Sequence, residues 1–496
     1  MPLLVLIALF VAFWSPIVPE NMAGPTRPDP SLAMSLGMIL ASVLMLGFVS
    51  AVIGRRLARK ASQVGQTFRN RHQLARSAQI LEVLALLAYA GLIYVPEWPR
   101  VVADRLRLRD WLLVEEALIL LPFPIMILTV WWGLFPAERS LKAARVRIGQ
   151  PIRLGGHLLM KARQAFGLVL PVAVLFALML EVDRRLESMV QVGAWVHLGL
   201  YAALGGLILI LSPAFVRLSW PSRPLPPGPL RDRLEHLAQR FGFGYTDILV
   251  WDTGGTLVNA GVTGALPWFR YVLLTDAMLE NLAPRQIEAV FGHEVGHIAH
   301  RHLTYFGVFF LGTMGVMALL SAGIDQVLTL DSPLWIWGRS RWVELLLQAA
   351  VALGFALAYF FVIFGFLSRW FERQADVFGC RVVSCGLADC PPHRDVNADP
   401  SMASGRVPEA LCPVGIGIFI EALSSVATLN GLEPRAASWR HGSIARRIDF
   451  LRQLEGRPEV EQRFQTQLQR LRLGLGLVLA TAMLLAITTG AIDSFR

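Results

Sequence analysis

The sequence predicts a mainly helical, polytopic membrane protein that also carries a small α+β domain. Of its 496 residues, 54% are hydrophobic and only 17% are charged, an apolar excess that a wholly soluble chain of this length does not need. The apolar residues gather in runs of about 18 to 24 residues nearly free of charge, the length of helix that crosses roughly 30 Å of hydrocarbon. About nine such runs are found, at about 1–18, 34–53, 78–95, 112–134, 164–181, 194–216, 305–324, 345–367 and 473–492.

The basic residues, which give the chain a net charge of +10, cluster beside the apolar runs. The loops at 54–77 and 135–163 are rich in arginine and lysine, as the positive-inside rule expects of cytoplasmic loops. This placement argues against a nucleic-acid partner and predicts a lipid bilayer as the surroundings. The run 1–18 is interpreted as an uncleaved span rather than a signal peptide, because no basic region precedes it and no small-residue cleavage site follows it. We therefore expect a multi-pass protein of the cell (inner) membrane with its amino terminus in the cytoplasm.

Soluble sequence begins at the Pro-rich stretch 221–229 (PSRPLPPGP), which marks a domain boundary. Beyond it, leucines at helical spacing follow Leu230, the segments YTDILVW and RYVLLTD predict short strands, and a long helix opens near Pro284. The expected order is an N-terminal membrane region with six spans at 1–220, a first soluble part at 221–304, a transmembrane hairpin at 305–367, a second soluble part at 368–470 and a last span at 471–496.

The segment HEVGH at 293–297 lies in the predicted long helix. Its two histidines, His293 and His297, are four residues apart, so they project from one face of a helix and can reach one zinc ion. Zinc acidifies water and polarises a scissile carbonyl, while Glu294 accepts the proton of the attacking water and passes it to the leaving amine. Composition alone yields this motif in about one chain in a hundred, so it predicts a zinc hydrolase site in its own right.

A catalytic zinc site needs a third protein ligand on the same side of the membrane. The segment ERQAD offers Glu372 and Asp376, two carboxylates one helical turn apart. Glu372 is the candidate ligand, and Asp376 is the candidate hydrogen-bond partner for the outer nitrogen of a ligating histidine. An acidic pair at this spacing is also common on solvated helix faces, but two intervening spans would return Glu372 to the face that holds His297.

Several other polar residues are predicted to have structural roles. His300 and His302 do not match the spacing of a further histidine ligand and are interpreted as surface or packing residues. Glu115 and Glu116 are expected at a membrane interface, and His197 is expected to pack within a span. The cysteines are expected to be reduced on the cytoplasmic side; a second metal site that includes His393 is the alternative. They are Cys380, Cys385, Cys390 and Cys412.

Taken together, five segments resemble the integral-membrane zinc metallopeptidases that include HtpX-type proteases and the type 1 CAAX prenyl proteases. The segments are VNA at 258–260, PWFRYVLLTDAMLENL at 267–282, HEVGH, ERQAD and HGSIARRI at 441–448. The resemblance extends from about residue 230 to 451 and implies a gluzincin-like peptidase domain with one zinc ion. The six upstream spans take no part in it.

The resemblance also implies a role for each matching residue. The zinc ligands would be His293, His297 and Glu372, with Glu294 as general base and Asp376 beside the ligands. Asn259 and Ala260 resemble the edge segment on which an extended substrate is laid. His441 resembles a candidate oxyanion stabiliser, and Arg447 resembles a substrate or structural contact.

The sequence departs from the family at two places. The family usually has proline after the late histidine, where this chain has Gly442, which makes the backbone beside His441 freer. The stretch 386–413, which contains Cys and Pro, is interpreted as an insertion that forms a lid or a docking loop.

The expected function is a membrane-embedded zinc endopeptidase that cuts protein or peptide substrates in membrane or membrane-associated proteins, with protein quality control as the leading role. The alternatives are a prenyl-protein (CAAX) processing protease and a non-catalytic membrane scaffold with a peptidase-like domain. The sequence leaves the cleaved bonds and the oligomeric state open.

Overall fold

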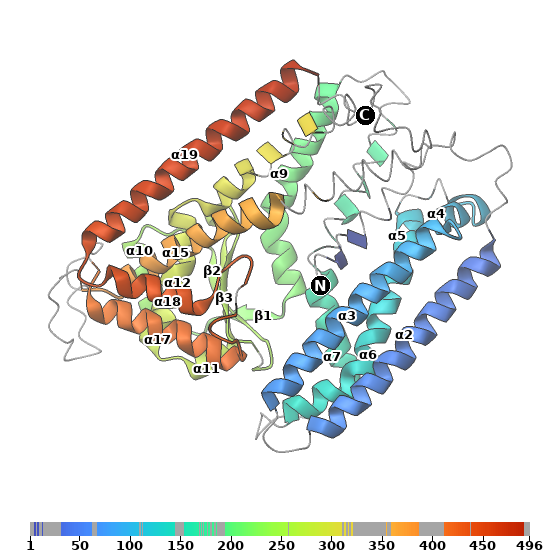
Figure 1. The fold of residues 1–496 in the computed structure, drawn as a ribbon, viewed down its shortest axis with the longest axis horizontal. Helices are drawn as coiled ribbons and strands as arrows, with labels where there is room; N and C mark the ends of the chain where they lie inside the picture. Colours follow the sequence, from blue (N-terminus) through green and yellow to red (C-terminus); the bar gives the residue numbers. More distant parts are fainter. Residues whose placement is uncertain are drawn as a thin grey trace, which may run out of the picture. The chain divides into compact units, whose positions relative to one another are not determined.

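The structure is a computed structural model of the 496-residue chain (Figure 1). It describes residues 31–61, 67–108, 113–143, 153–167, 194–255, 257–309, 359–385, 411–436 and 438–490, together with isolated positions between 4 and 12, between 169 and 185, between 312 and 320, and at 111 and 354. The described residues are mainly helical, with one small sheet.

The chain divides into two compact units, Met1–Pro221 and Ser222–Arg496. In the first unit, α2 and α6 pack closely because two glycines meet: a Cβ added to Gly54 would lie 2.2 Å from the carbonyl oxygen of Gly133. Small residues at a helix crossing allow this approach of two backbones. The described helices of this unit are α2 (Leu32–Ala61), α3 (Thr67–Tyr94), α4 (Trp98–Arg100), η3 (Val101–Arg105), α5 (Val114–Leu120), α6 (Pro122–Ala143), α7 (Leu154–Phe166) and α9 (Ala194–Ser219).

Five helical stretches in the described part of the chain are long and apolar enough to cross a membrane. Four of them, Leu32–Lys60, Gln73–Tyr94, Val114–Leu141 and Pro458–Thr488, coincide with runs in the sequence. The run 194–216 lies within α9, whose apolar stretch is shorter. The runs 1–18, 164–181, 305–324 and 345–367 lie wholly or partly outside the described residues. Several membrane spans are therefore supported, but the count of nine is not.

The fifth stretch, α17 (Pro413–Asn430), is apolar for a different reason. It packs on α12 and α15, and Ile416, Phe419 and Leu423 belong to the core of the second unit. Most of its apolar side chains are buried or partly buried against this core, so we interpret α17 as a helix of the peptidase-like domain rather than a span.

The second unit is built around a four-stranded sheet in the order β1-β2-β4-β3. The predicted strands are present as β2 (Asp247–Trp251) and β4 (Tyr271–Thr275), which run parallel, while β1 (Ser222–Pro224) and β3 (Ala260–Thr263) form antiparallel edges. The unit also contains several helices, of which α12 packs on β3 and α11 on β4 (Figure 1). They are α10 (Pro229–Arg240), α11 (Asp276–Asn281), α12 (Pro284–Ala299), α15 (Gly365–Val382, preceded by η6, Tyr359–Phe364), α17, α18 (Ile444–Leu454) and α19 (Pro458–Thr488).

Helices α12 and α15 approach closely because glycine stands at their contact points. A Cβ on Gly296 would lie 2.9 Å from Phe378 Cβ and 3.2 Å from Ala375 Cα. A Cβ on Gly379 would lie 2.8 Å from the carbonyl oxygen of Ala289. This contact joins the helix that carries HEVGH to the helix that carries ERQAD.

Candidate metal centre

Two helices bring three potential metal ligands together. Pro284 opens α12, and the side chain of Gln286 accepts a hydrogen bond from the Ala283 N–H at 3.1 Å, which caps the first turn. One face of α12 then presents His293 and His297, whose Nε2 atoms are 3.2 Å apart. Both Nε2 atoms lie 3.7 Å from a carboxylate oxygen of Glu372 on α15.

The ligand atoms of His293, His297 and Glu372 all lie within 4.8 Å of one another. Among the described residues, this is the one group of three or more side chains placed to hold a metal ion. Two imidazoles and a carboxylate are a donor set typical of catalytic zinc, which leaves a fourth position for substrate or water.

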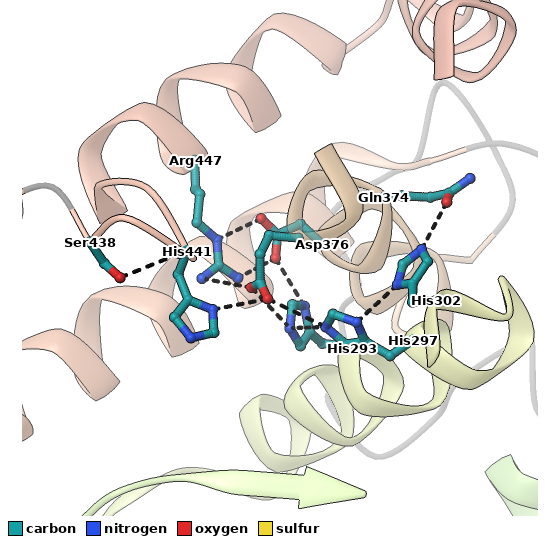
Figure 2. A network of polar contacts seen from close by, with 9 residues as sticks. His293, His297, His302, Gln374, Asp376, Ser438, His441 and Arg447 are labelled. Carbon is teal, nitrogen blue, oxygen red and sulfur yellow. Dashed lines mark hydrogen bonds and ion pairs between the residues drawn. The ribbon is translucent and has the colours of Figure 1, made fainter. Parts of the chain in front are cut away.

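Asp376 orients the first histidine. Its Oδ1 lies 3.0 Å from His293 Nδ1, and its two oxygens accept bonds from the guanidinium of Arg447 on α18 (Figure 2), one of them from Nε at 2.8 Å. Burial by itself would raise the pKa of Asp376, but the charge of Arg447 and its hydrogen bonds hold that pKa below the usual range. An ionised Asp376 beside Nδ1 favours the tautomer of His293 that carries its proton there, which leaves the lone pair on Nε2.

His302 orients the second histidine. Its Nδ1 lies 2.9 Å from His297 Nδ1, and its Nε2 lies 3.0 Å from Gln374 Oε1 (Figure 2). The same Gln374 oxygen accepts a bond from Arg472 of α19 at 2.5 Å. Burial lowers the pKa of His302 to about 2 and that of His297 to about 3, so both rings are neutral at physiological pH.

One arrangement of protons satisfies this series of hydrogen bonds, which runs from Arg472 through Gln374 and His302 to His297. Because Arg472 can only donate, Gln374 Oε1 is an acceptor, and the His302 proton therefore sits on Nε2. The bare Nδ1 of His302 then accepts the Nδ1 proton of His297, which leaves the lone pair of His297 Nε2 facing the centre. Both histidines thus present Nε2, the geometry that a zinc ion requires of them, and the site fits the metal.

His302 is a packing residue and not one of the metal ligands, but it also contacts the ligand His297, which the sequence did not predict. It stacks on Phe371 with ring centroids 4.3 Å apart and is buried, with 1% of its surface exposed. On a continuous helix, a residue five positions after His297 would point away from it. Here α12 ends at Ala299 and Arg301 adopts a left-handed conformation with φ 55°, which returns the next residue to the ligand. Helical periodicity therefore could not predict this contact.

Glu294 follows the first ligand on α12 and is half-buried. Burial raises its pKa, the charge of His293 opposes that rise, and the charge of Glu372 adds to it. A carboxylate with a raised pKa beside the three ligands is suited to receive a proton during a reaction.

His441 lies in the loop before α18 (Figure 2), and its Nδ1 is 2.9 Å from Glu372 Oε1. Although burial would raise the pKa of Glu372, this contact and the charge of Arg447 hold it well below its usual value. Arg447 forms ion pairs with the carboxylates of Glu372 and Asp376. Gly442 has φ 74°, a left-handed conformation that proline cannot adopt.

The candidate edge segment lies on β3, which borders the sheet and packs against α12. The backbone of Asn259 is occupied, because its N–H donates to Thr275 Oγ1 at 3.0 Å and its carbonyl accepts the Thr275 N–H at 3.1 Å. Ala260 opens the strand and has its backbone polar groups on the outer side of the sheet.

None of the remaining polar candidates belongs to the described group of metal ligands. Cys380, Cys385 and Cys412 are present as thiols, whereas residues 386–410 of the insertion, Cys390 and His393 among them, lie outside the described residues. Glu115 and Glu116 occupy the first turn of α5 in the N-terminal unit. His197 lies in α9, and its side chain is not among those described.

Residues 224–396, which contain both HEVGH and ERQAD, match the sequence profile of peptidase family M48. The chain carries a peptidase family M48 domain. The M48 domain resembles the protease HtpX homolog of Pyrobaculum aerophilum, with 34% identity over 148 residues, which are 26% of this chain and 42% of that protein. It also resembles CAAX prenyl protease 1 of Saccharomyces cerevisiae, with 27% identity over 179 residues, 31% of this chain and 38% of that protein.

These sequence matches to the M48 domain span less than half of the length of either relative. The fold similarity extends further. The crystal structure of S. mikatae Ste24p matches with a TM-score of 0.50 and covers 85% of this chain and 99% of that chain, at 17% identity. The resemblance to integral-membrane metallopeptidases is therefore confirmed for the M48 domain, and the likeness to Ste24p concerns the fold.

Proposed function

We propose that this protein is a membrane-bound zinc endopeptidase that hydrolyses peptide bonds in membrane or membrane-associated proteins. The observation that carries the proposal is the convergence of His293, His297 and Glu372 with a carboxylate, Glu294, next to the first ligand. The M48 domain and the candidate spans support it.

In this proposal, His293, His297 and Glu372 would hold a zinc ion, which would supply polarisation of the scissile carbonyl and a lowered pKa of the attacking water. Glu294 accepts the proton of that water and delivers it to the leaving amine. Asp376 and His302 hold the two imidazoles in the tautomers that bind metal. His441, whose side chain is about half exposed, would donate a hydrogen bond to the developing oxyanion.

Glu294→Gln tests the chemistry. The amide keeps the shape of the side chain but cannot accept a proton, so zinc should remain bound while turnover is abolished. Zinc content and cleavage of an unfolded protein such as casein are measured on the purified full chain. Substantial residual cleavage by the metal-loaded variant would remove Glu294 from the role of base. A zinc-free or inactive native protein would instead favour the membrane scaffold.

The leading biological role is proteolytic quality control at the cell (inner) membrane, with the zinc site facing the cytoplasm. Processing of prenylated proteins is the second candidate, and the similarity to proteins named CAAX prenyl protease 1 and Ste24p favours it. Cleavage of a farnesylated peptide in strong preference to its unmodified form would decide for the second role. Cysteine labels at Leu303 and Arg373 should react from the same side of the membrane, since Leu303 follows His302, which contacts the ligand His297, and Arg373 follows the ligand Glu372.

A further inference from the structure

The outer edge of β3 carries backbone groups that the sheet leaves free. In the register of β3 against β4, Gly261 lies opposite Leu273 and Ala260 lies opposite Leu274. Because the Thr275 N–H donates to the Asn259 carbonyl, residues 259, 261 and 263 form the pairs that bond to β4. Ala260 and Val262 therefore direct their N–H and C=O groups outward, and no other described strand pairs with them.

Val258, two residues before Ala260, also directs its backbone groups outward, but these groups are already hydrogen-bonded. The Val258 N–H donates to Asn430 Oδ1 at 3.0 Å, and the Val258 carbonyl accepts from Asn430 Nδ2 at 2.7 Å. Only one orientation of the amide satisfies both bonds. The side chain thus offers Val258 one donor and one acceptor, as the backbone of a neighbouring strand would.

The place of Asn430 is fixed by the helix that bears it. It is the last residue of α17, and Gly431 follows with φ 67°, the left-handed conformation that ends a helix. Since α17 packs on α12 and β3 also packs on α12, the end of the edge is tied to the helix of the metal ligands.

We propose that Asn430 closes the pairing edge of β3 at Val258 and so sets the register in which an extended peptide lies along Ala260 and Val262. This inference rests on the proposed peptidase function and adds a specificity-determining residue to it. A peptide that adds to this edge as a strand can pair with Ala260 and Val262, whereas the backbone groups of Val258 are already bonded to Asn430. The peptide is thereby held at a fixed distance from the metal centre.

Backbone N-methylation of a bound peptide tests the register. The zinc-loaded Glu294→Gln full chain is screened with fluorescein-labelled 12-residue peptides that tile casein, and the tightest binder is then methylated at one amide at a time. Two amides, two residues apart, should be sensitive, because either strand direction places one peptide N–H on each outward carbonyl. Each methylation should weaken binding about tenfold, the value of one lost hydrogen bond of upper-range strength. The absence of any binding peptide, or three or more sensitive amides at this spacing, would overturn the proposal.

Asn430→Ala, in the same background, should release Val258 and make a third amide sensitive, two residues beyond the first two. Asn430→Ser serves as a second variant that also cannot reach Val258. The matched control is Asn281→Ala, which removes another asparagine bond to the backbone, from Nδ2 to the Ala277 carbonyl, and should keep the parental pattern. An unchanged pattern in both folded Asn430 variants contradicts the proposal. Because binding is measured without turnover, failure of hydrolysis in the native protein would be seen separately.

Discussion

His302 Nδ1 lies 2.9 Å from Nδ1 of His297, so one imidazole supports another at the metal centre. The supporting ring is anchored through Gln374, which Arg472 and Gln465 of α19 hold from the other side. A series of hydrogen bonds therefore connects α19, a candidate membrane span, to His297, a candidate zinc ligand.

Replacement of His302 by alanine should lower zinc affinity or activity by roughly 10- to 100-fold, because His297 loses the acceptor that fixes its tautomer. Zinc affinity is measured by competition with a chelator, and kcat is measured at saturating zinc. The control is His300→Ala, which removes the neighbouring histidine whose ring lies 5.9 Å from that of His302. Equal losses in the two variants would show that His302 has no special relation to the ligand.

The two carboxylates of ERQAD, Glu372 and Asp376, should differ in their effect on bound zinc, because only Glu372 is a proposed ligand. Glu372→Ala should reduce bound zinc about as severely as His293→Ala, since each change removes a ligand. Asp376→Ala should cost roughly 10- to 100-fold, because it removes only the partner of His293. Metal content per chain is the measurement, with Glu421→Ala on the exposed face of α17 as the control for loss of a carboxylate. Full zinc occupancy in Glu372→Ala would exclude it as a ligand.

His441→Ala should lower kcat by roughly 100-fold or more while zinc is retained, if the imidazole stabilises the oxyanion. The contact between His441 Nδ1 and Glu372 Oε1 allows a different result, in which zinc is lost together with activity. Parallel measurement of kcat and zinc content separates these roles. A variant with native kcat would return His441 to a structural role.

Gly296→Ala should destabilise the M48 domain by about 1–3 kcal/mol, because the new methyl group would overlap Phe378 and Ala375 of α15. The matched control is Gly417→Ala on α17, where no atom lies within 4 Å of the added Cβ; this change should be neutral or stabilise the helix by up to about 1 kcal/mol. Thermal unfolding of both variants is compared without added zinc. Equal melting temperatures would contradict the close packing of α12 against α15.

The local pattern of the sequence predicted much of the second unit. Alternating and apolar runs indicated β2 and β4, the Pro284 signal indicated the start of α12, and helical spacing placed His293 and His297 on one face. Four membrane candidates were also predicted from run length. Helix α17 is long and apolar enough to cross a membrane, but its apolar side chains pack against other helices of the second unit. Length and composition alone do not reveal this packing.

The sequence by itself determined which residues could bind metal and which segments form helices, because both depend on neighbours a few positions away. Only the tertiary structure decided how those residues are supported. The turn at Arg301 brought His302 to His297, and Gln374 meets His302 from 72 residues away. Asn430 reaches Val258 across 172 residues. Such contacts depend on how packed helices meet, and glycines such as Gly296 matter there because they permit an approach that no local periodicity encodes.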